Sequence, residues 1–315
     1  MGYSCSKCVS NVRLDGKTAV VTGCNVGIGK ETVKDLYRRG AKVIMACRNV
    51  KAAEEAAEDI RKVSTDYQNT GDLQVVHLDL SNLKLVKECS EKLIKNENRI
   101  DLLINNGGVM MCPFSKTVDG YEMHFGTNHL GHFLFTLLLL PKIIQSRHSR
   151  VILVSSMVHY GGVIDFGDLN YTSKPYSGLA AYKQSKLANV LFAKELARRL
   201  QERNINNVNT YSLHPGVVAT DLSRHFDTYL TGLKNVYNFL AKFFAKNAEQ
   251  GAQTTIYCAV HENCASETGL YYDDCKVKKP CADAENLDIA KKLWDVSWEL
   301  VGLEKSYDPF RRYSP

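Results

Sequence analysis

The chain has 315 residues, of which 44% are hydrophobic and 23% charged, an ordinary globular composition with ample length for a large core. Its formal net charge of +6 has two interpretations. The simpler one is a solvated surface that is basic overall, and the more specific one is attraction to an anionic cofactor or membrane surface. These values exclude a fibrous or low-complexity protein, and we expect no nucleic-acid partner.

The cysteines and apolar runs indicate the compartment. Most of the ten cysteines stand inside apolar runs, as Cys24, Cys47 and Cys258 do, which is typical of reduced thiols in an intracellular protein. The longest apolar run, Phe133–Leu140, is far shorter than the ~20 residues of a membrane span, and no signal peptide opens the chain. We therefore expect neither a transmembrane helix nor secretion.

The first residues carry a candidate lipid anchor. Met1–Ser6 fits the pattern for N-myristoylation on Gly2, and Cys5 and Cys8 lie where a second, palmitoyl chain could attach. The alternative is an N-terminal tail, residues 1–14, that matches a loose pattern by chance. An anchor predicts the cytoplasmic face of a membrane, such as the endoplasmic reticulum, and its absence predicts the cytoplasm. Cys5-x-x-Cys8 lacks the further ligands of a zinc site, so we expect no metal.

Apolar β-branched runs alternate with helical stretches over residues 15–305. We expect strands at Lys17–Thr22, Lys42–Ala46, Leu73–Leu78, Ile100–Ile104, Arg150–Val154, Val208–Leu213 and Gly269–Tyr272. We expect helices at Lys30–Arg39, Lys51–Lys62, Leu83–Lys95, Tyr121–Gln145, Leu179–Gln201 and Ala248–Val260. The alternation predicts a single-domain α/β fold of the Rossmann type, a doubly wound parallel sheet with helices on both faces, followed by a tail at 306–315.

A glycine-rich turn joins the first expected strand to the first expected helix. It reads Thr22-Gly23-Cys-Asn25-Val-Gly27-Ile28-Gly29. Glycines let the backbone approach a pyrophosphate, and the following helix offers free N–H groups and its positive dipole end. A plain turn is the alternative, but the position within a βαβ series favours a dinucleotide site.

The residue after the second strand selects the dinucleotide. An acidic residue at this place binds the ribose 2′-hydroxyl of NAD, whereas an arginine accommodates a 2′-phosphate. The chain has Cys47-Arg48-Asn49 here, without a carboxylate. Arg48 therefore predicts NADP(H), with a surface arginine of no special role as the alternative.

Tyr182-Lys-Gln-Ser-Lys186 places a tyrosine and a lysine on one face of a helix. A nearby ammonium favours phenolate and lowers a tyrosine pKa, which suits Tyr182 to moving a proton on a hydroxyl or carbonyl oxygen. Tyr3 and Tyr272 have the same spacing to a lysine. They precede the first strand and follow the last one, so context favours Tyr182, on a helix after the fifth strand.

The spacing G-x-x-x-G-x-G, together with Tyr182 and Lys186, resembles the short-chain dehydrogenase/reductase family over roughly residues 15–300. The resemblance implies hydride transfer with a nicotinamide cofactor, with Tyr182 as proton donor or acceptor. It implies that Lys186 lowers the tyrosine pKa and holds the nicotinamide ribose. It implies that Ser156, at the end of the fifth strand, polarises the substrate carbonyl, and that Asn128 holds a water linking the lysine to solvent.

The resemblance also implies cofactor contacts at other strand ends. They are Asp79 and Leu80 after the third strand, Asn105, Asn106 and Gly107 after the fourth, and Pro215, Gly216, Val218 and Thr220 after the sixth. In the family the aspartate contacts the adenine amino group, and the last segment flanks the nicotinamide. Gly107 stands where the family usually has alanine. Taken alone, each of these segments would be a turn.

Two segments border the expected substrate mouth. Residues 221–250 form a basic amphipathic stretch, interpreted either as core packing or as a cap that walls an apolar pocket and contacts a membrane surface. His159–Tyr176 looks like an inserted loop at the mouth, because it lengthens the interval between Ser156 and Tyr182.

Longer strings narrow the resemblance to the retinol dehydrogenase branch of the family, near retinol dehydrogenases 11 to 14. They are Leu103–Pro113, Asn128–Phe133, Ser185–Asn189 and Leu293–Ser297. The branch implies a lipophilic alcohol or aldehyde as substrate, retinol and retinaldehyde foremost, and the family implies a homodimer or tetramer. We expect no N-terminal membrane helix of the kind common in that branch. A steroid or xenobiotic carbonyl reductase is one alternative, and a non-catalytic dinucleotide-binding regulator, suggested by Gly107, is another.

Overall fold

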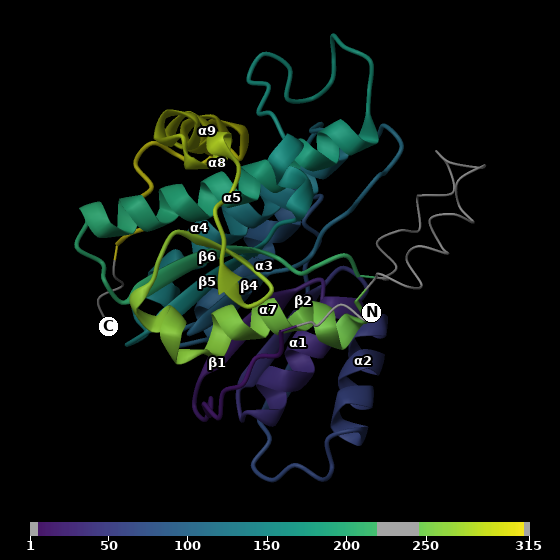
Figure 1. The fold of residues 1–315 in the computed structure, drawn as a ribbon, viewed down its shortest axis with the longest axis vertical. Helices are drawn as coiled ribbons and strands as arrows, with labels where there is room; N and C mark the ends of the chain where they lie inside the picture. The colour runs from purple at the N-terminus through teal and green to yellow at the C-terminus, as the bar shows by residue number, and fades with distance from the viewer. Residues whose placement is uncertain (1–5, 219–245, 312–315) are drawn as a thin grey trace.

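A computed structural model describes residues 6–218 and 246–311 of the chain (Figure 1). Gly2, Cys5, Thr220 and most of the predicted cap at 221–250 lie outside the described residues. Within them, a central, mostly parallel sheet is covered by helices on both faces. This arrangement confirms the predicted doubly wound α/β fold.

The described residues form a sheet of eight strands in the order β3-β2-β1-β4-β5-β6-β7-β8. The strands are β1 (Thr18–Thr22), β2 (Lys42–Cys47), β3 (Asp72–His77), β4 (Leu102–Asn105), β5 (Ser149–Val154), β6 (Val208–His214), β7 (Leu270–Asp273) and β8 (Lys276–Val277). β1 to β7 run parallel, and β8, which the sequence did not lead us to expect, pairs antiparallel with β7. Strand order reverses between β1 and β4, so a crevice is expected beyond their carboxyl ends.

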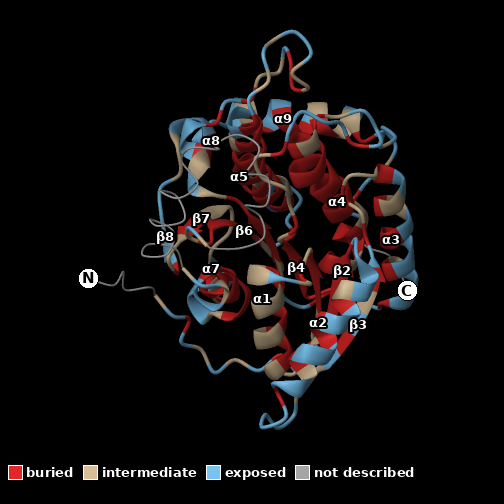
Figure 2. Ribbon diagram, turned by 90° about the vertical axis from the view of Figure 1, so that its right-hand side faces the viewer, coloured by how far each residue is buried: buried red, intermediate tan, exposed pale blue. Residues whose placement is uncertain are grey.

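Two layers of helices bury apolar side chains against the sheet. One face is covered by α1 (Gly27–Arg38), α2 (Val50–Lys62) and α7 (Ala248–Val260). The other is covered by α3 (Leu83–Asn96), α4 (Gly131–Ile144) and α5 (Gly178–Glu202), with α8 (Ala282–Glu285) and α9 (Leu287–Leu300) packed outside α5. Because α4 and α5 lie between the sheet and other helices, they are the most buried helices in Figure 2.

The helix predicted at about Tyr121–Gln145 is present, but it contains a π-helical turn that the sequence analysis did not predict. Helical structure begins at Met123, passes through a π-helical turn, Phe125–Leu130, and continues as α4. The chain turns before the helix because the Tyr121 carbonyl accepts a hydrogen bond from Thr117 N–H, and the Glu122 carboxylate accepts one from Phe125 N–H. The wider π-helical turn contains Asn128, one of the predicted site residues.

Helix α9 is an element that the sequence analysis missed. Trp294 in this helix packs against the rings of Phe133 and Phe192, with centroid distances of 5.2 and 5.9 Å. The Ser297 hydroxyl is hydrogen-bonded to His129 Nε2 at 2.8 Å. α9 therefore ties the C-terminal part of the fold to the π-helical turn.

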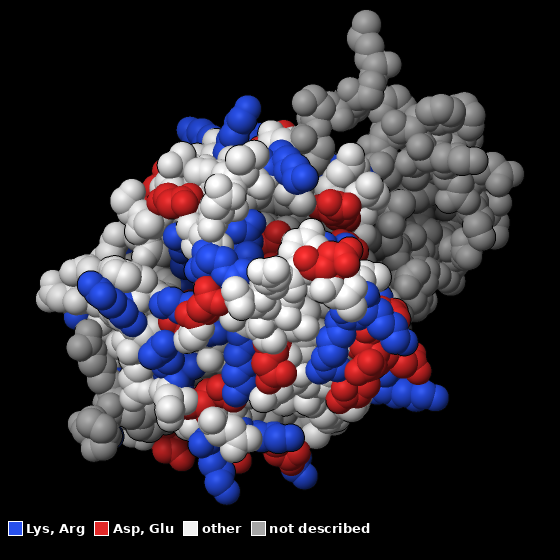
Figure 3. Space-filling view, turned by 90° about the horizontal axis from the view of Figure 1, so that it is seen from below, with Lys and Arg blue, Asp and Glu red and all other residues white. Residues whose placement is uncertain are grey.

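The surface below the view of Figure 1 carries charges of both signs. In Figure 3, lysine and arginine side chains on this face are interspersed with aspartate and glutamate. On this face the basic side chains are therefore part of a mixed, solvated surface, as the modest net charge suggested. None of the helices formed by the described residues is long and apolar enough to cross a membrane.

Candidate active site

A cavity of about 700 Å³ opens at the carboxyl ends of the parallel strands, where strand order reverses. The predicted site residues that line it are Gly23, Asn25, Gly27, Ile28, Gly29, Arg48, Asp79, Leu80, Asn106, Gly107, Ser156, Tyr182, Lys186, Pro215, Gly216 and Val218. The sequence analysis missed others, among them Ala46, Asn49, Leu78, Gly108, Val154 and His214. Each of these lies at or next to a strand end, which is the signal that could have found it.

The glycine-rich turn packs directly against the loop that follows β4. Gly23 has φ = +59°, and a Cβ there would lie 2.6 Å from the Gly107 Cα. A Cβ on Gly29 would lie 2.6 Å from Asn106 Nδ2. No side-chain cap satisfies the first N–H groups of α1 among the described residues, so they are available to an anion. The turn therefore fits a diphosphate.

Two predicted cofactor contacts do not line the cavity. Thr22 is buried, and its hydroxyl oxygen accepts hydrogen bonds from the N–H groups of Asn106 and Gly107 at 3.0 and 2.9 Å. Asn105 is also buried, and its side-chain amide donates to the Thr136 hydroxyl at 2.8 Å. The prediction is corrected for both residues: they support the loop after β4 from behind, because the polar ends of β1 and β4 must be satisfied inside the fold.

One end of the cavity is walled by polar residues after β2 and β3. Arg48 is exposed at the rim, and the neighbouring Asn49 caps α2 by accepting a hydrogen bond from Ala52 N–H at 3.0 Å. The Asp79 carboxylate accepts bonds from the N–H and hydroxyl of Ser81 at 2.9 and 2.6 Å. The wall therefore carries the Arg48 cation at its rim and the Asp79 carboxylate, which is fixed by its hydrogen bonds to Ser81.

Tyr182, Ser156 and Lys186 converge at the other end. Tyr182 and Lys186 come from α5, and Ser156 directly follows β5. The Ser156 side chain lies close enough to the Tyr182 hydroxyl to lower its pKa. Lys186 Nζ lies 5.5 Å from the centroid of the Tyr182 ring and donates to the Val154 carbonyl at 3.1 Å. The helical spacing of four therefore brings the tyrosine and lysine together, as predicted.

Burial controls the protonation of both side chains. It raises the pKa of Tyr182 to about 12, against a smaller lowering by the hydrogen bond with Ser156. Burial also lowers the pKa of Lys186 to about 8. Burial of Tyr182 is the larger effect here, and the Lys186 ammonium is directed at the Val154 carbonyl, so the predicted lowering of the Tyr182 pKa by Lys186 stays a prediction. Tyr182 keeps its proton and is suited to donate it.

The two serines after β5 have different surroundings. The buried Ser155 hydroxyl donates to the Lys186 carbonyl at 2.7 Å, whereas the partly exposed Ser156 hydroxyl reaches Tyr182. The Ser156 carbonyl accepts a hydrogen bond from His159 Nδ1 at 2.7 Å, and His159 Nε2 accepts one from Cys281 N–H at 3.3 Å. A buried histidine thus fixes the backbone of the serine that faces the cavity.

Asn128 lies behind the cavity. Its side-chain amide donates to the Val109 carbonyl and the Ser185 hydroxyl at 2.9 and 3.0 Å, and its Oδ1 accepts from Val109 N–H at 2.8 Å. Asn128 therefore joins the loop after β4 to α5 beside Lys186. Its predicted contact with a water stays a prediction.

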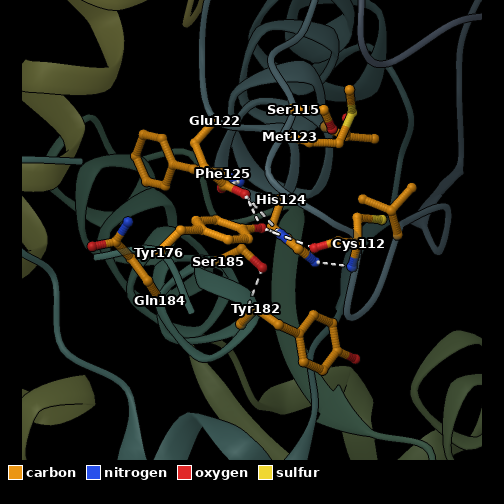
Figure 4. A network of polar contacts seen from close by, with 12 residues as sticks. Cys112, Ser115, Glu122, Met123, His124, Phe125, Tyr176, Tyr182, Gln184 and Ser185 are labelled. Atoms are coloured by element: carbon orange, nitrogen blue, oxygen red, sulfur yellow. Dashed lines mark hydrogen bonds and ion pairs between the residues drawn. The ribbon is translucent and has the colours of Figure 1, made fainter. Parts of the chain in front are cut away.

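A polar network lies beside Tyr182 (Figure 4). The buried Glu122 carboxylate accepts hydrogen bonds from His124 Nδ1 and the Tyr176 hydroxyl at 2.7 and 3.1 Å. His124 Nε2 accepts a bond from Cys112 N–H at 3.2 Å, and the His124 and Tyr182 ring centroids are 6.0 Å apart. The network holds the loop after β4 against the residues that precede α5.

The loop at His159–Tyr176 does not line the described cavity, and its predicted place at the border of the substrate mouth stays a prediction. Its neighbours Met157, Val158 and Leu179 line the cavity instead. Within the loop the Asp168 carboxylate accepts four hydrogen bonds from Thr172 and Ser173, and Tyr176 joins the Glu122 network.

The histidines near Asn128 are used in internal hydrogen bonds. His132 Nδ1 contacts the Asn128 carbonyl at 3.0 Å, and its Nε2 contacts the Thr22 hydroxyl at 2.9 Å. His124 and His129 have the partners given above. The described residues contain no group of three histidine, cysteine or acidic side chains placed to hold a metal ion.

The segment after β6 closes the remaining side. Gly216 has φ = +92°, and a Cβ there would lie 2.6 Å from the Lys246 side chain. Val218 and Lys246 form a parallel β-bridge, and Lys246 pairs with Asp274 at 2.9 Å. Pro215, Gly216 and Val218 thus line the cavity, while Thr220 lies outside the described residues.

Comparison with known proteins identifies the family. A family model described as short chain dehydrogenase matches residues 17–229, a range that holds the glycine-rich turn, Ser156 and Tyr182. The chain belongs to the short-chain dehydrogenase family. It is therefore an oxidoreductase of a family that uses NAD(P)(H).

This short-chain dehydrogenase is similar to several retinol dehydrogenases. It is 47% identical to human retinol dehydrogenase 13 over 94% of this chain and 88% of that protein. It is 46% identical to human retinol dehydrogenase 11, over 94% of this chain and 89% of that protein. The predicted membership of the retinol dehydrogenase-like branch is thereby confirmed.

Solved structures agree on the fold. An uncharacterised protein from Mycobacterium Paratuberculosis superimposes with a TM-score of 0.73 at 34% identity, covering 92% of this chain and 94% of that one. A 7α-hydroxysteroid dehydrogenase superimposes with a TM-score of 0.64 at 20% identity, covering 84% of this chain and 94% of that one. At that identity the second likeness concerns the fold alone.

Proposed function

We propose that this short-chain dehydrogenase is an NADP(H)-dependent enzyme that interconverts a lipophilic alcohol and its aldehyde. Retinol and retinaldehyde, or related longer-chain aldehydes, are the proposed substrates. The observation that carries the proposal is the convergence of Tyr182, Ser156 and Lys186 at the apolar end of a cavity whose other end fits a dinucleotide.

The side chains divide the work of proton transfer. The dinucleotide, when bound, supplies or accepts the hydride. Ser156 donates a hydrogen bond that orients and polarises the substrate oxygen, and the protonated Tyr182 gives that oxygen its proton in the reductive direction. Lys186 is held by Val154 beside the ring, where its positive charge stabilises the phenolate left after the transfer.

Arg48 supports NADP(H) over NAD(H). It follows β2 at the cavity rim, where a ribose 2′-phosphate would lie, and no carboxylate occupies the position that would bind a 2′-hydroxyl. A guanidinium matches phosphate geometry with two parallel hydrogen bonds. Asp79 and Leu80 on the next strand end are proposed to flank the adenine.

The apolar end supports a lipophilic substrate. The residues that line it beside Tyr182 are Val109, Met110, Met111, Met157, Val158 and Leu179. Methionine side chains adapt to irregular apolar shapes, such as a polyene or an alkyl chain. Met111 has φ = +53°, so the backbone is held in an uncommon conformation where the loop meets the substrate space.

Access to such a substrate supports membrane attachment through the N-terminus. Ser6 is hydrogen-bonded to Asp274 at 2.8 Å, and Cys8 N–H donates to Gln253 at 3.0 Å, so the segment runs along α7. Cys8 is buried, and burial raises the pKa of its thiol to about 11, which argues against a palmitoyl chain there. The proposal therefore concerns a lipid on Gly2, with Cys5 as a second site.

One alternative remains and one loses its support. A steroid or xenobiotic ketone keeps the same chemistry, and the apolar lining also suits it. A regulator without turnover was suggested by Gly107, but Gly107 packs closely against Gly23 and still lines the cavity. The chain belongs to a family of oxidoreductases and has Tyr182, Lys186 and Ser156. Both facts favour an enzyme over a regulator without turnover.

A substrate panel assayed with both dinucleotides tests the proposal. Retinaldehyde, medium- and long-chain aldehydes and a steroid ketone are each offered with NADPH and with NADH, and nucleotide oxidation is followed. We expect the highest kcat/KM for retinaldehyde or a long-chain aldehyde with NADPH. Faster turnover of the steroid ketone would favour the alternative substrate, and no turnover of any compound would contradict the proposed function.

A further inference from the structure

Two buried thiols lie directly behind the glycine-rich turn. Cys24 belongs to the turn and Cys47 ends β2, and neither side chain is more than 1% exposed. Their Sγ atoms are 3.6 Å apart, and Cys24 N–H donates to Cys47 Sγ at 3.3 Å. The Cys24 thiol has one hydrogen, which it can donate to Cys47 Sγ or to the Val21 carbonyl, 3.2 Å away. The proposed chemistry uses neither thiol.

The chain neighbours of both cysteines line the dinucleotide cavity. They are Gly23 and Asn25 around Cys24, and Ala46 and Arg48 around Cys47. Gly23 N–H donates to the Ala46 carbonyl at 2.9 Å, so the turn and the end of β2 form one hydrogen-bonded unit. A change at the sulfur pair therefore reaches the residues that face a diphosphate and a 2′-phosphate.

The turn has little room to follow a displaced sulfur. A disulfide bond is about 2.05 Å long, so the Sγ atoms must approach by roughly 1.5 Å from their 3.6 Å separation. A Cβ on Gly29 would lie 2.7 Å from the Cys24 Cα, and one on Gly23 2.6 Å from the Gly107 Cα. Backbone thus packs closely on both sides of the turn. Bond formation has to shift the turn that fits the diphosphate.

We propose that Cys24 and Cys47 form a peroxide-sensitive thiol pair, whose oxidation to a disulfide prevents dinucleotide binding. The Cys47 thiolate attacks one oxygen of hydrogen peroxide, the O–O bond breaks, and a sulfenic acid forms as hydroxide leaves. The Cys24 thiolate then attacks the sulfenic sulfur, and its oxygen leaves as water. In total, two thiols and one hydrogen peroxide give one disulfide and two waters. The consequence for binding rests on the dinucleotide site of the proposed function.

The contacts support Cys47 as the thiol that reacts first. The hydrogen bond from Cys24 lowers the pKa of the Cys47 thiol, whereas burial raises the pKa of Cys24. The thiolate is the reactive form, so Cys47 is the better nucleophile and Cys24 resolves the sulfenic acid. The residues around both cysteines face the cavity, so a bound dinucleotide would cover the approach of a peroxide.

The test treats the cofactor-free protein with hydrogen peroxide, in the presence and absence of saturating NADPH. We expect a Cys24–Cys47 linked peptide by mass spectrometry, an NADPH Kd raised at least about tenfold, recovery with dithiothreitol, and protection by NADPH. The linked peptide is detected by its mass, so its detection does not depend on NADPH binding. If NADPH fails to bind the reduced protein, that result would contradict the proposed function and not the thiol-pair proposal. Absence of the linked peptide, or a linked protein with unchanged Kd, would overturn the thiol-pair proposal.

Three variants separate this pair from general oxidation. Cys24→Ala and Cys47→Ala should keep NADPH binding and lose its sensitivity to peroxide. Cys258→Ala is the matched control and should stay sensitive, because Cys258 is another buried thiol, beside Cys264, and neither residue lines the cavity. If the alanine variants unfold, the proposal is still tested by the unmodified chain. In that chain the linked peptide should form with peroxide and disappear with dithiothreitol. Peroxide sensitivity that persists in both Cys24→Ala and Cys47→Ala would contradict the proposal.

Discussion

Burial governs the ionisable side chains that α5 brings to the cavity. In the structure burial raises the pKa of Tyr182 to about 12 and lowers the pKa of Lys186 to about 8, so near pH 7 the tyrosine keeps its proton and the lysine keeps its charge. Their helical spacing could be predicted from the sequence, because it depends on local geometry alone. Their pKa values could not, since desolvation depends on everything packed around them.

The lowered pKa of Lys186 predicts a pH dependence of stability. Between about pH 8 and its ordinary pKa of 10.5, the lysine is protonated in the unfolded chain but not in the cofactor-free native state. The unfolded state then binds more protons, so the free energy of unfolding rises with pH, by up to about 1.4 kcal/mol per unit for this one group. Lys186→Met buries no ionisable group at this position, so near pH 8 it should be more stable than the unmodified chain. Its free energy of unfolding lacks the rise with pH, so this advantage should shrink from pH 8 to pH 10.

Denaturant unfolding at several pH values measures this difference. Lys183→Met, on the same helix, controls for the loss of a lysine. A difference between Lys186→Met and the unmodified chain that stays constant from pH 8 to pH 10 would show that burial does not control Lys186.

Arg48 should select between the two dinucleotides. A hydrogen bond to a charged group contributes about 1.5–3 kcal/mol, so Arg48→Ala should raise the KM for NADPH roughly ten- to a hundredfold and change the KM for NADH little. Steady-state kinetics with both dinucleotides measure the effect. Arg61→Ala, which removes another arginine of the same βα unit, is the control. Equal changes in the two KM values for Arg48→Ala would refute a 2′-phosphate contact.

At the scale of elements, the sequence predicts what periodicity and burial determine. β1, β2, β4 and β5 are near-continuous apolar runs, as strands buried on both faces must be, and each was expected near its observed position. The π-helical turn was not, because it depends on the Glu122 carboxylate and on neighbours distant in sequence. β8 is too short to have a pattern of its own.

Helix α9 is expected to stabilise the fold through one of the two tryptophans it carries. Trp294 is 3% exposed and packs among Phe133, Phe192 and the Arg199 guanidinium, whereas Trp298 is partly exposed. Trp294→Ala should lower the free energy of unfolding by about 3–5 kcal/mol, and Trp298→Ala by clearly less. Chemical denaturation of both variants measures this. Equal losses would mean that α9 does not dock through Trp294.

At the scale of the whole molecule, the site follows from the topology. Ligands of doubly wound sheets bind at the reversal of strand order, so residues at strand ends could be expected to meet there. Thr22 and Asn105 were expected to contact the cofactor, but in the structure they lie behind the cavity wall. A pattern of strand ends does not distinguish the side chains that line a site from those that support it.

Attachment to a membrane is also a property of the whole molecule, and the N-terminal lipid proposed on Gly2 makes it testable. If Gly2 is myristoylated, Gly2→Ala should lower the membrane-bound fraction of the expressed protein, because a single acyl chain contributes marginal but measurable binding. Cys8→Ser should leave that fraction unchanged, since Cys8 is buried against the fold. Cell fractionation compares the variants. Unchanged membrane binding of Gly2→Ala would exclude myristate as the essential anchor.

The most direct test of the central claim is the turnover of Tyr182→Phe with retinaldehyde and NADPH. Loss of the proton donor should lower kcat by about 10²–10⁴-fold, while the NADPH Kd stays close to that of the unmodified enzyme. Tyr176→Phe is the matched control, since its hydroxyl bonds to Cys112 and Glu122 away from the reacting oxygen, and it should keep most of its activity. Turnover of Tyr182→Phe equal to that of the unmodified enzyme would contradict the account.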